Sequence, residues 1–372
     1  MPLVRRELLA YDAAQQLHHY QEKYPLLQPA QKLFVDQVLQ ATGTAFFLDA
    51  VGGAGKTFCE NLILSKLRSE GKIAVAVATS GVAATLQQGG KTAQGHLKLP
   101  ILYADGCTWN IAAQSAEAAL FREADLFIGD EATMAHRYLH EALDKGLQDI
   151  MENDEPFGGK NVIFSGDFRQ TLPIVPKGSE AQIVAASLKR STLWNQLHLL
   201  KLHENMRVRT NGVMNPQAEE YATWLLQLGN GTVPMAQGQQ DPSIIQLPPS
   251  LCINASIIEL IDWTFPNLRD NVADAQWLAG RCIFAPKNTM VEAINKECLE
   301  RIPCVSWLCH SADAVVDQQN GLAVPPEYLH TLLPLGLPPH TLVLKRGILI
   351  MLLRNLNPYR GLCNGTLSLI HI

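Results

Sequence analysis

Apolar runs in the first half of the chain alternate with segments in which apolar residues recur at helical spacing. The runs lie at 46–48, 73–78, 126–129 and 162–164. The helical stripes between them lie at 34–39, 62–67 and 139–151. A continuous apolar run is typical of a parallel strand, because helices cover both faces of its sheet. The pattern therefore predicts an α/β fold with a parallel sheet flanked by helices.

The stretch after the first run has the order strand, glycine turn, helix. Lys56 and Thr57 stand where the turn enters the helix. Backbone N–H groups of such a turn can surround phosphate oxygens, and the helix N-terminus adds partial positive charge. We expect Lys56 to reach the β- and γ-phosphates of ATP and the Thr57 hydroxyl to hold Mg²⁺. The loop residues expected to bind the nucleotide are Gly52, Gly53, Ala54 and Gly55.

One position departs from the usual phosphate-loop pattern, G-x-x-x-x-G-K-[ST]. Its first glycine is Ala50 in this chain. Alanine adds one methyl group, so the turn is expected to survive with slightly less backbone freedom. The alternative, a glycine-rich turn that binds nothing, is disfavoured because Lys56 and Thr57 follow in register.

Polar residues follow the later apolar runs, where open α/β sheets place their sites. The run at 126–129 ends in Asp130 and Glu131, which suit a ligand to the Mg²⁺ hydration shell and a base for the attacking water. The run at 162–164 leads to Gln170, which is placed to sense the γ-phosphate. An exposed acidic pair and an ordinary polar loop are the alternatives for these two segments.

Length and charge limit the possible partners. The chain has 372 residues, and we expect two domains. Its formal net charge is −5, so no overall positive field attracts nucleic acid. Any contact with nucleic acid must therefore come from a local groove.

The eight cysteines are scattered, which favours free thiols in a reducing compartment. Cys304, Cys309 and His310 lack paired C-x-x-C spacing, and we interpret them as core or loop residues rather than a zinc site. The best candidate for a membrane span, 342–353, is interrupted by charged residues, so we predict no membrane span.

Seven blocks, in this order and spacing, resemble one family from about Leu27 onward. They are FFLDAVGGAGKT, ATSGVAA, GDEATMAHR, GDFRQTLPIVPKG, ASLKRSTLW, LHENMRV and LPPHTLVLKRGILIMLLRNLNPYRGLCNGT. The family is that of the PIF (petite integration frequency) DNA helicases, relatives of bacterial RecD in helicase superfamily one. The chain looks closest to the plant, fungal and transposon-borne members.

The resemblance implies roles for further residues. Gln31 would contact adenine, Gln170 would couple the nucleotide state to DNA, and Arg207 would be an arginine finger, for which its planar fork suits it. Asp130 and Glu131 would be the metal-water ligand and the catalytic base. Residues implied to approach single-stranded DNA are Thr79, Ser80, Gly81 and Thr92. At 92–95 the family's Thr-x-His-Ser is replaced by Thr-Ala-Gln-Gly, which puts the Thr92 contact in question.

The resemblance also implies the architecture, a P-loop NTPase with two RecA-like lobes. We expect an N-terminal extension, a RecA-like ATPase lobe and a second, incomplete RecA-like lobe at 1–27, 28–198 and 199–372. In the last part, 281–285 is expected to be a strand and 291–299 a helix. The family's later blocks, one around Lys-Ser-Gln-Gly and one ending Ala-Leu-Ser-Arg, do not occur before Ile372. We therefore expect a C-terminally truncated member of the family.

The function implied is that of a monomeric 5′–3′ DNA helicase, which couples ATP hydrolysis with Mg²⁺ to movement on single-stranded DNA and at junctions with duplex. The resemblance implies a role in DNA repair, recombination and telomere maintenance. The expected compartment is the nucleus, and the mitochondrion is the alternative. Two alternatives stay open: a truncated protein that binds ATP or DNA without hydrolysis, and a P-loop ATPase that does not act on nucleic acid.

Overall fold

The computed structural model describes residues 3–99, 106–210, 213–241, 243–314, 325–332, 337–353, 356, 362 and 366–370. The chain divides into two compact units, Met1–Met235 and Ala236–Ile372. Within the described residues, no helix combines the length and the apolarity needed to cross a bilayer.

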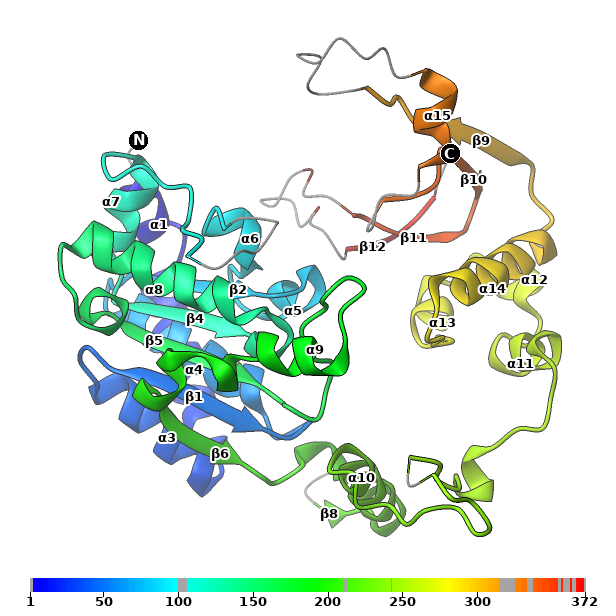
Figure 1. Ribbon diagram of the computed structural model, residues 1–372, viewed down its shortest axis with the longest axis horizontal. Coiled ribbons are helices and arrows are strands. Elements are labelled where there is room, and N and C mark those ends of the chain that lie inside the picture. The colour runs from blue at the N-terminus through cyan, green and yellow to red at the C-terminus, as the bar shows by residue number, and fades with distance from the viewer. Residues whose placement is uncertain are drawn as a thin grey trace. The chain divides into compact units, whose positions relative to one another are not determined.

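The first unit is built on a six-stranded sheet whose neighbouring strands are all parallel (Figure 1). The strand order is β3-β2-β4-β5-β1-β6. The strands are β1 (Ala45–Ala50), β2 (Ala74–Ala78), β3 (Lys91–Thr92), β4 (Leu126–Asp130), β5 (Asn161–Gly166) and β6 (His198–Leu202). The predicted parallel α/β sheet is confirmed.

Two hydrophobic cores lie on opposite faces of this sheet. Because successive side chains in a strand point to opposite faces, Phe47 joins one core while Phe46 and Leu48 join the other. Helices α7 (Ala116–Glu123) and α8 (Arg137–Met151) supply the first core, and α3 (Pro29–Gln40) and α4 (Lys56–Ser69) supply the second. Both faces of β1 are therefore buried, which explains why its apolar run does not alternate with polar residues.

The remaining elements of the first unit are short or lie outside the two cores. They are α1 (Leu3–Leu8), α2 (Ala13–Lys23), α5 (Gly81–Leu86), α6 (Ala93–His96), α9 (Glu180–Ala186), α10 (Pro216–Gly229), β7 (Arg209–Thr210) and β8 (Val213–Met214).

The described part of the second unit contains five α-helices, a 3₁₀ helix (Pro249–Leu251) and two antiparallel strand pairs, β9 with β10 and β11 with β12. The helices are α11 (Ile257–Thr264), α12 (Leu268–Asn271), α13 (Ala275–Ala279), α14 (Asn288–Arg301) and α15 (Pro326–Thr331). The strands are β9 (Ser306–His310), β10 (Thr341–Lys345), β11 (Leu349–Met351) and β12 (Leu367–Leu369). These described strands form no parallel sheet, so a second RecA-like lobe remains a prediction.

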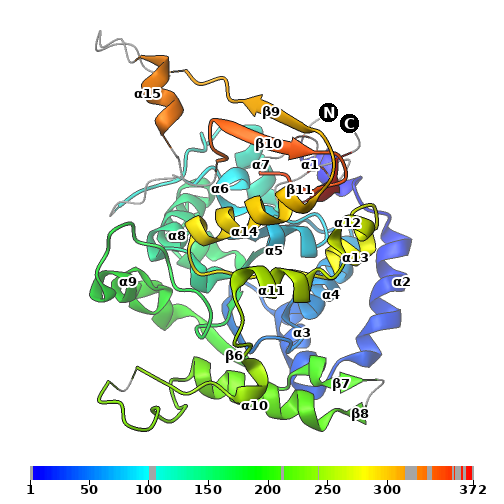
Figure 2. The same ribbon diagram turned by 90° about the vertical axis from the view of Figure 1, so that its right-hand side faces the viewer.

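Three boundaries differ from those expected. The predicted extension at 1–27 contains α2, which packs against α4 and belongs to the first unit (Figure 2). The predicted division at 198/199 falls at the start of β6, which pairs with β1 and completes the first sheet. The helix expected at 291–299 lies within α14, but 281–285 is not a strand, because no described strand pairs with it.

Candidate active site

The loops that carry the candidate site residues leave the sheet at one edge. Strands β1, β2, β4 and β5 run parallel, so their carboxyl ends lie together. A crevice beyond the carboxyl ends is the usual ligand site of open α/β sheets.

The phosphate loop tolerates Ala50 because this residue is still part of a strand. Ala50 is the last residue of β1, pairs with Leu202 of β6 and is buried. The glycines that the turn requires come later, since Gly53 and Gly55 both have a φ of 84°. In this left-handed conformation a side chain would be strained. The missing first glycine therefore leaves the turn intact.

Lys56 lies between the two predicted carboxylates. Its Nζ is 2.6 Å from Asp130 Oδ1 and 2.8 Å from Glu131 Oε1. The exposed fractions of the Lys56 and Asp130 side chains are only 13% and 2%. Burial alone would lower the pKa of Lys56, but the charges of Asp130 and Glu131 outweigh it and raise that pKa. The structure thus brings together three residues that the sequence separates by up to 75 positions.

The backbone of Glu131 directs its side chain. Its φ of 53° is left-handed, which is uncommon for a residue other than glycine and which recurs at functional sites. The Glu131 N–H donates to Asp130 Oδ1 at 2.7 Å. Glu131 Oε2 is buried and has no hydrogen-bond partner within the described residues. One oxygen of this carboxylate thus pairs with Lys56, and the other is unsatisfied.

These residues fit a nucleoside triphosphate with Mg²⁺. The turn at Gly53 and Gly55 forms a phosphate cradle, and Lys56 supplies a buried cation beside it. Thr57 lies in the first turn of α4, next to the cradle. The unsatisfied oxygen of Glu131 lacks the donor that a water molecule would supply.

Glu60 is a third carboxylate that the sequence did not reveal. It is fully buried on α4, where its Oε2 accepts from Gln87 Nε2 at 2.9 Å. Ser165 Oγ lies 2.5 Å from Glu60 Oε1 and 3.0 Å from Asp130 Oδ1. Burial and the nearby charge of Asp130 raise the pKa of Glu60 to about 7.

The number of hydrogens shared by Glu60, Ser165 and Asp130 favours a neutral, protonated Glu60. Ser165 has one hydroxyl hydrogen and two acidic neighbours. If Glu60 is protonated, it donates to Ser165, and Ser165 donates to Asp130. Each of the three side chains then has a hydrogen-bond partner, and Ser165 fixes the orientation of the Asp130 carboxylate.

Replacing Glu60 with glutamine should remove part of the pH dependence of stability. The pKa of Glu60 is about 7 in the folded chain and 4.5 without perturbation, so the folded state binds more protons between these values. Stability therefore falls as the pH rises through this window, by roughly 2–3 kcal/mol. Urea unfolding of both proteins at pH 5 and pH 8 measures the difference. Glu123→Gln, at an exposed position, is the matched control.

Gln31 stabilises the phosphate loop through a side-chain hydrogen bond to its backbone. Its Nε2 donates to the Ala54 carbonyl at 2.8 Å, and its Oε1 accepts from the Gln28 N–H at 2.9 Å. The side chain is buried against Gly55. An adenine contact by Gln31, which remains a prediction, would require one of these bonds to be exchanged.

The segment after β6 packs over the loop. The Met206 N–H donates to the Gly53 carbonyl at 2.9 Å, and a Cβ on Gly53 would lie 3.1 Å from Arg207 Cγ. Asn205 Oδ1 also lies against Gly53 and accepts from the Arg207 N–H at 2.9 Å. Arg207 is thus next to the phosphate loop, and Asn205, which the sequence pattern did not indicate, orients its backbone.

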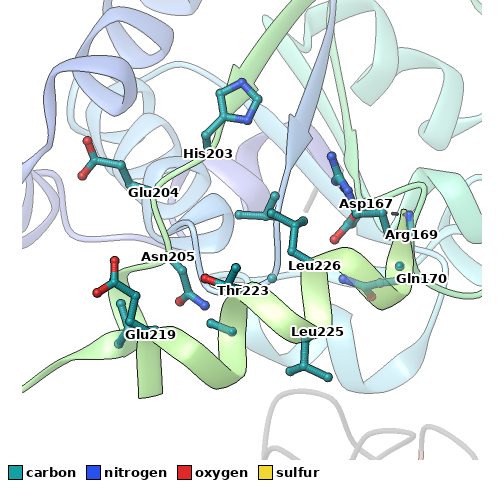
Figure 3. A pocket seen from close by; sticks show the side chains of 15 residues that line it. Asp167, Arg169, Gln170, His203, Glu204, Asn205, Glu219, Thr223, Leu225 and Leu226 are labelled. Atoms are coloured by element: carbon teal, nitrogen blue, oxygen red, sulfur yellow. Dashed lines mark hydrogen bonds and ion pairs between the residues drawn. The ribbon is translucent and has the colours of Figure 1, made fainter. Parts of the chain in front are cut away.

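A cavity of about 490 Å³ adjoins the loop within the first unit (Figure 3). Gln170 lines it together with Gly52 of the loop. Its other walls come from residues 203–208 and from α10. Gln170 therefore shares a cavity with the start of the phosphate loop, and Lys56 is not among the residues that line this cavity.

The four candidate DNA contacts meet at the ends of two neighbouring strands. Thr79 follows β2, and Thr92 ends β3, where it pairs with Ala78. Ser80 caps α5 by accepting from the Ala83 N–H at 3.1 Å, and Gly81 is the first residue of that helix. The Thr79 hydroxyl donates to the Glu131 carbonyl at 2.9 Å, which links this strand end to the candidate base.

Two family models match the chain. One, described as PIF1-like helicase, matches residues 27–239, and one, described as the 2B domain of DNA helicase Pif1, matches residues 327–371.

Curated relatives carry matching names. The ATP-dependent DNA helicase RRM3 of Saccharomyces cerevisiae is 27% identical over 198 residues, which is 52% of this chain and 27% of that protein. The ATP-dependent DNA helicase PIF1 of Danio rerio is 25% identical over 369 residues, 95% of this chain and 49% of the relative. The chain thus spans about a quarter to a half of these relatives.

Solved structures share the fold. Bacteroides Pif1 bound to single-stranded DNA matches this chain with a TM-score of 0.62 at 20% identity. The match covers 93% of this chain and 69% of the Bacteroides chain. Pif1 from Candida albicans matches with a TM-score of 0.59 at 20% identity, and the match covers 92% of this chain and 68% of the Candida chain.

Proposed function

The chain belongs to the PIF1-like helicase family, and from this premise we propose that it couples ATP hydrolysis to movement along single-stranded DNA and to the unwinding of duplex. The observation that carries the proposal is the placement of Lys56 against Asp130 and Glu131, directly below a glycine cradle. Family membership and site geometry, obtained independently, point to the same reaction.

Each residue of the site has a defined task. Lys56 would exchange its carboxylate partners for phosphate oxygens and neutralise their charge. Thr57 and, through water, Asp130 would hold Mg²⁺, which neutralises charge on the phosphates. Glu131 would orient the attacking water and accept its proton, using the oxygen that has no partner among the described residues.

Contacts between the loops offer a route from hydrolysis to DNA. Thr79 donates to the carbonyl of Glu131, so a movement of Glu131 would also move Thr79 at the end of β2. Arg207 and Gln170 approach the phosphate loop from the segment after β6 and the loop after β5. We propose that these residues report the nucleotide state to the strand ends that approach DNA, Thr79, Ser80, Gly81 and Thr92.

The relatives support an action on DNA. Several are named ATP-dependent DNA helicases, and one solved structure holds single-stranded DNA. We propose 5′–3′ movement by a monomer, a preference for junctions of single- and double-stranded DNA, and nuclear roles in repair, recombination and telomere maintenance.

ATPase stimulation tests this proposal. We expect the rate of ATP hydrolysis by the full chain to rise at least tenfold when single-stranded DNA is added, and to respond far less to blunt duplex or to an unfolded polypeptide. Stimulation by the polypeptide instead would favour a remodelling ATPase. Nucleotide binding without hydrolysis under all conditions would favour a protein that only binds ATP or DNA.

A further inference from the structure

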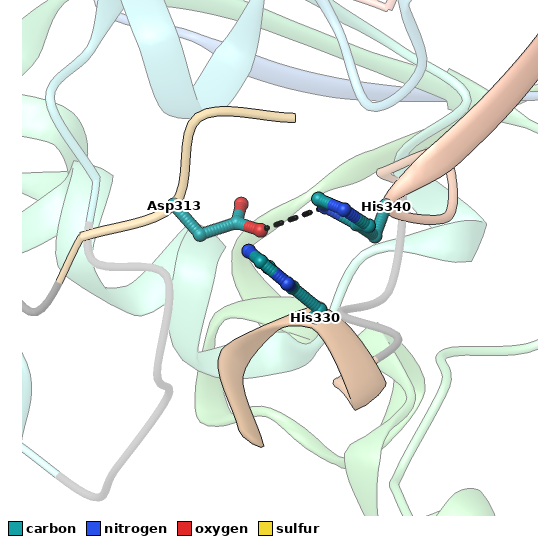
Figure 4. A group of neighbouring side chains, drawn as sticks. All are labelled: Asp313, His330 and His340. Atoms are coloured by element: carbon teal, nitrogen blue, oxygen red, sulfur yellow. Dashed lines mark ion pairs between the residues drawn. The ribbon is translucent and has the colours of Figure 1, made fainter. Parts of the chain in front are cut away.

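Three side chains with metal-binding groups converge in the second unit, in a part that the proposed ATPase does not use. They are Asp313, His330 and His340, and one ligand atom from each lies within 4.8 Å of the other two (Figure 4). The exposed Asp313 and the half-buried histidines are accessible to an ion from solvent.

Backbone pairing brings two of the three together. In the β9–β10 ladder Thr341 pairs with His310, and the Ser311 N–H donates to the His340 carbonyl at 2.8 Å. His340 therefore lies opposite Ser311, and Asp313 follows two residues later. His340 and Asp313 already form an ion pair at 3.5 Å.

The third side chain comes from a helix that has few other contacts. His330 lies in the last turn of α15, and no residue of this helix is buried. Its ring stacks on that of His340 with centroids 3.7 Å apart. Since α15 buries no side chain, this ring contact joins an exposed helix to the β9–β10 strand pair.

A neighbouring hydroxyl orients two of the side chains. Ser311 Oγ lies 2.6 Å from Asp313 Oδ2 and 2.7 Å from His340 Nδ1. Metal-binding sites commonly contain such partners, which fix the orientation of the ligands behind the ion. His310 also stacks with His340, with ring centroids 5.2 Å apart.

We propose that Asp313, His330 and His340 form a binding site for a divalent transition-metal ion, with Zn²⁺ as the first candidate, that joins α15 to the β9–β10 strand pair. Two imidazoles with one carboxylate suit Zn²⁺, Co²⁺ or Ni²⁺, whereas Mg²⁺ and Ca²⁺ prefer sets of oxygen ligands. The site is therefore chemically distinct from that proposed for Mg²⁺ at Thr57.

Binding of the ion requires a local rearrangement of these side chains. With bonds of about 2.0–2.1 Å, tetrahedral ligand atoms stand roughly 3.4 Å apart, so the three atoms, now within 4.8 Å of one another, approach by up to about 1.4 Å. Because the two imidazole planes are only 14° apart, one ring must also tilt so that the lone pairs of both rings point at the ion. Three protein ligands leave a fourth position for water.

Calorimetric titration of the full chain with Zn²⁺, in buffer containing excess Mg²⁺, tests the site. We expect one strong site in the unchanged protein, weakened at least tenfold in His330→Ala and in Asp313→Asn. The second variant keeps the shape of the side chain, and circular dichroism of both checks the fold. His18→Ala removes an exposed histidine from α2 and should leave the affinity unchanged.

Co²⁺ absorption identifies the ligands. A site of two imidazoles and a carboxylate gives visible bands without the intense ultraviolet charge transfer of a thiolate. A thiolate band would assign the ion to cysteines and overturn the proposal. The proposal also fails if Zn²⁺ does not bind, or if both site variants bind it as strongly as the His18 control. None of these measurements depends on ATP hydrolysis, so the proposed function can fail independently.

Discussion

Replacing Lys56 with alanine should reduce ATP hydrolysis by at least 10²–10³-fold, the loss typical when a preorganised charge at a reacting group is removed. The ammonium of Lys56 is the buried cation beside the glycine cradle, and its pairs with Asp130 and Glu131 hold it there. Alanine offers no charge to the β- and γ-phosphates, so nucleotide affinity should fall as well. Steady-state hydrolysis with saturating single-stranded DNA and binding of a fluorescent ATP analogue measure the two effects.

The control for this variant must separate chemistry from folding. In the nucleotide-free chain, removing Lys56 leaves two carboxylates without their cation, a change that costs about 3–5 kcal/mol for a buried pair. The double variant Lys56→Ala with Glu131→Gln removes one of the two carboxylate charges that the first substitution leaves without a partner. It should recover part of the unfolding free energy, which urea unfolding measures and which shows how much of the effect of Lys56→Ala is a loss of folding. Hydrolysis at the unchanged rate by folded Lys56→Ala would contradict the proposed site.

The edge that carries the candidate active site could be predicted because its signals are local. A strand, a glycine turn and Lys56-Thr57 occupy one stretch of sequence, and the strand that ends in Asp130 and Glu131 is equally self-contained. Both strands pair in parallel with β5, which lies between them, so their carboxyl ends lie at the same edge of the sheet. The ion pairs at 2.6 and 2.8 Å are the geometric result.

Glu60 escaped prediction because its meaning depends on distant residues. On α4 it stands among apolar positions and reads as a solvated charge in an amphipathic helix. Only the fold shows that it faces Ser165, which lies 105 positions later in the chain, and Gln87. A lone buried carboxyl can be inferred only once its neighbours are known.

The end of the first unit was misplaced for a similar reason. Strand β6 lies at the edge of the sheet, and most of its side chains are exposed or half-exposed, so its apolar pattern is weak. It reads equally well as the start of a new segment. Its pairing with β1 is what assigns it to the first sheet, and a pairing across about 150 residues leaves no local signal.

Replacing Glu131 with glutamine should slow hydrolysis by about 10²–10⁴-fold, the range for loss of a general base, while nucleotide binding is retained. Glutamine keeps the size of the side chain but cannot accept the proton of the attacking water. Lys56 keeps Asp130 as its partner, so the fold should lose little stability. This separates the variant from Lys56→Ala, in which binding and hydrolysis fall together.

Single-turnover hydrolysis and binding of the fluorescent ATP analogue, both with single-stranded DNA present, measure the separation. Glu123→Gln makes the same chemical change at an exposed position and should behave like the unchanged chain. Because hydrolysis is slow, the variant should remain in its ATP-bound state and hold single-stranded DNA with the affinity of that state. The bond from Thr79 to the backbone carbonyl of residue 131 is unchanged by the substitution. An unchanged rate would place the base elsewhere. A loss of binding equal to the loss of rate would show that Glu131 holds the nucleotide rather than activating water.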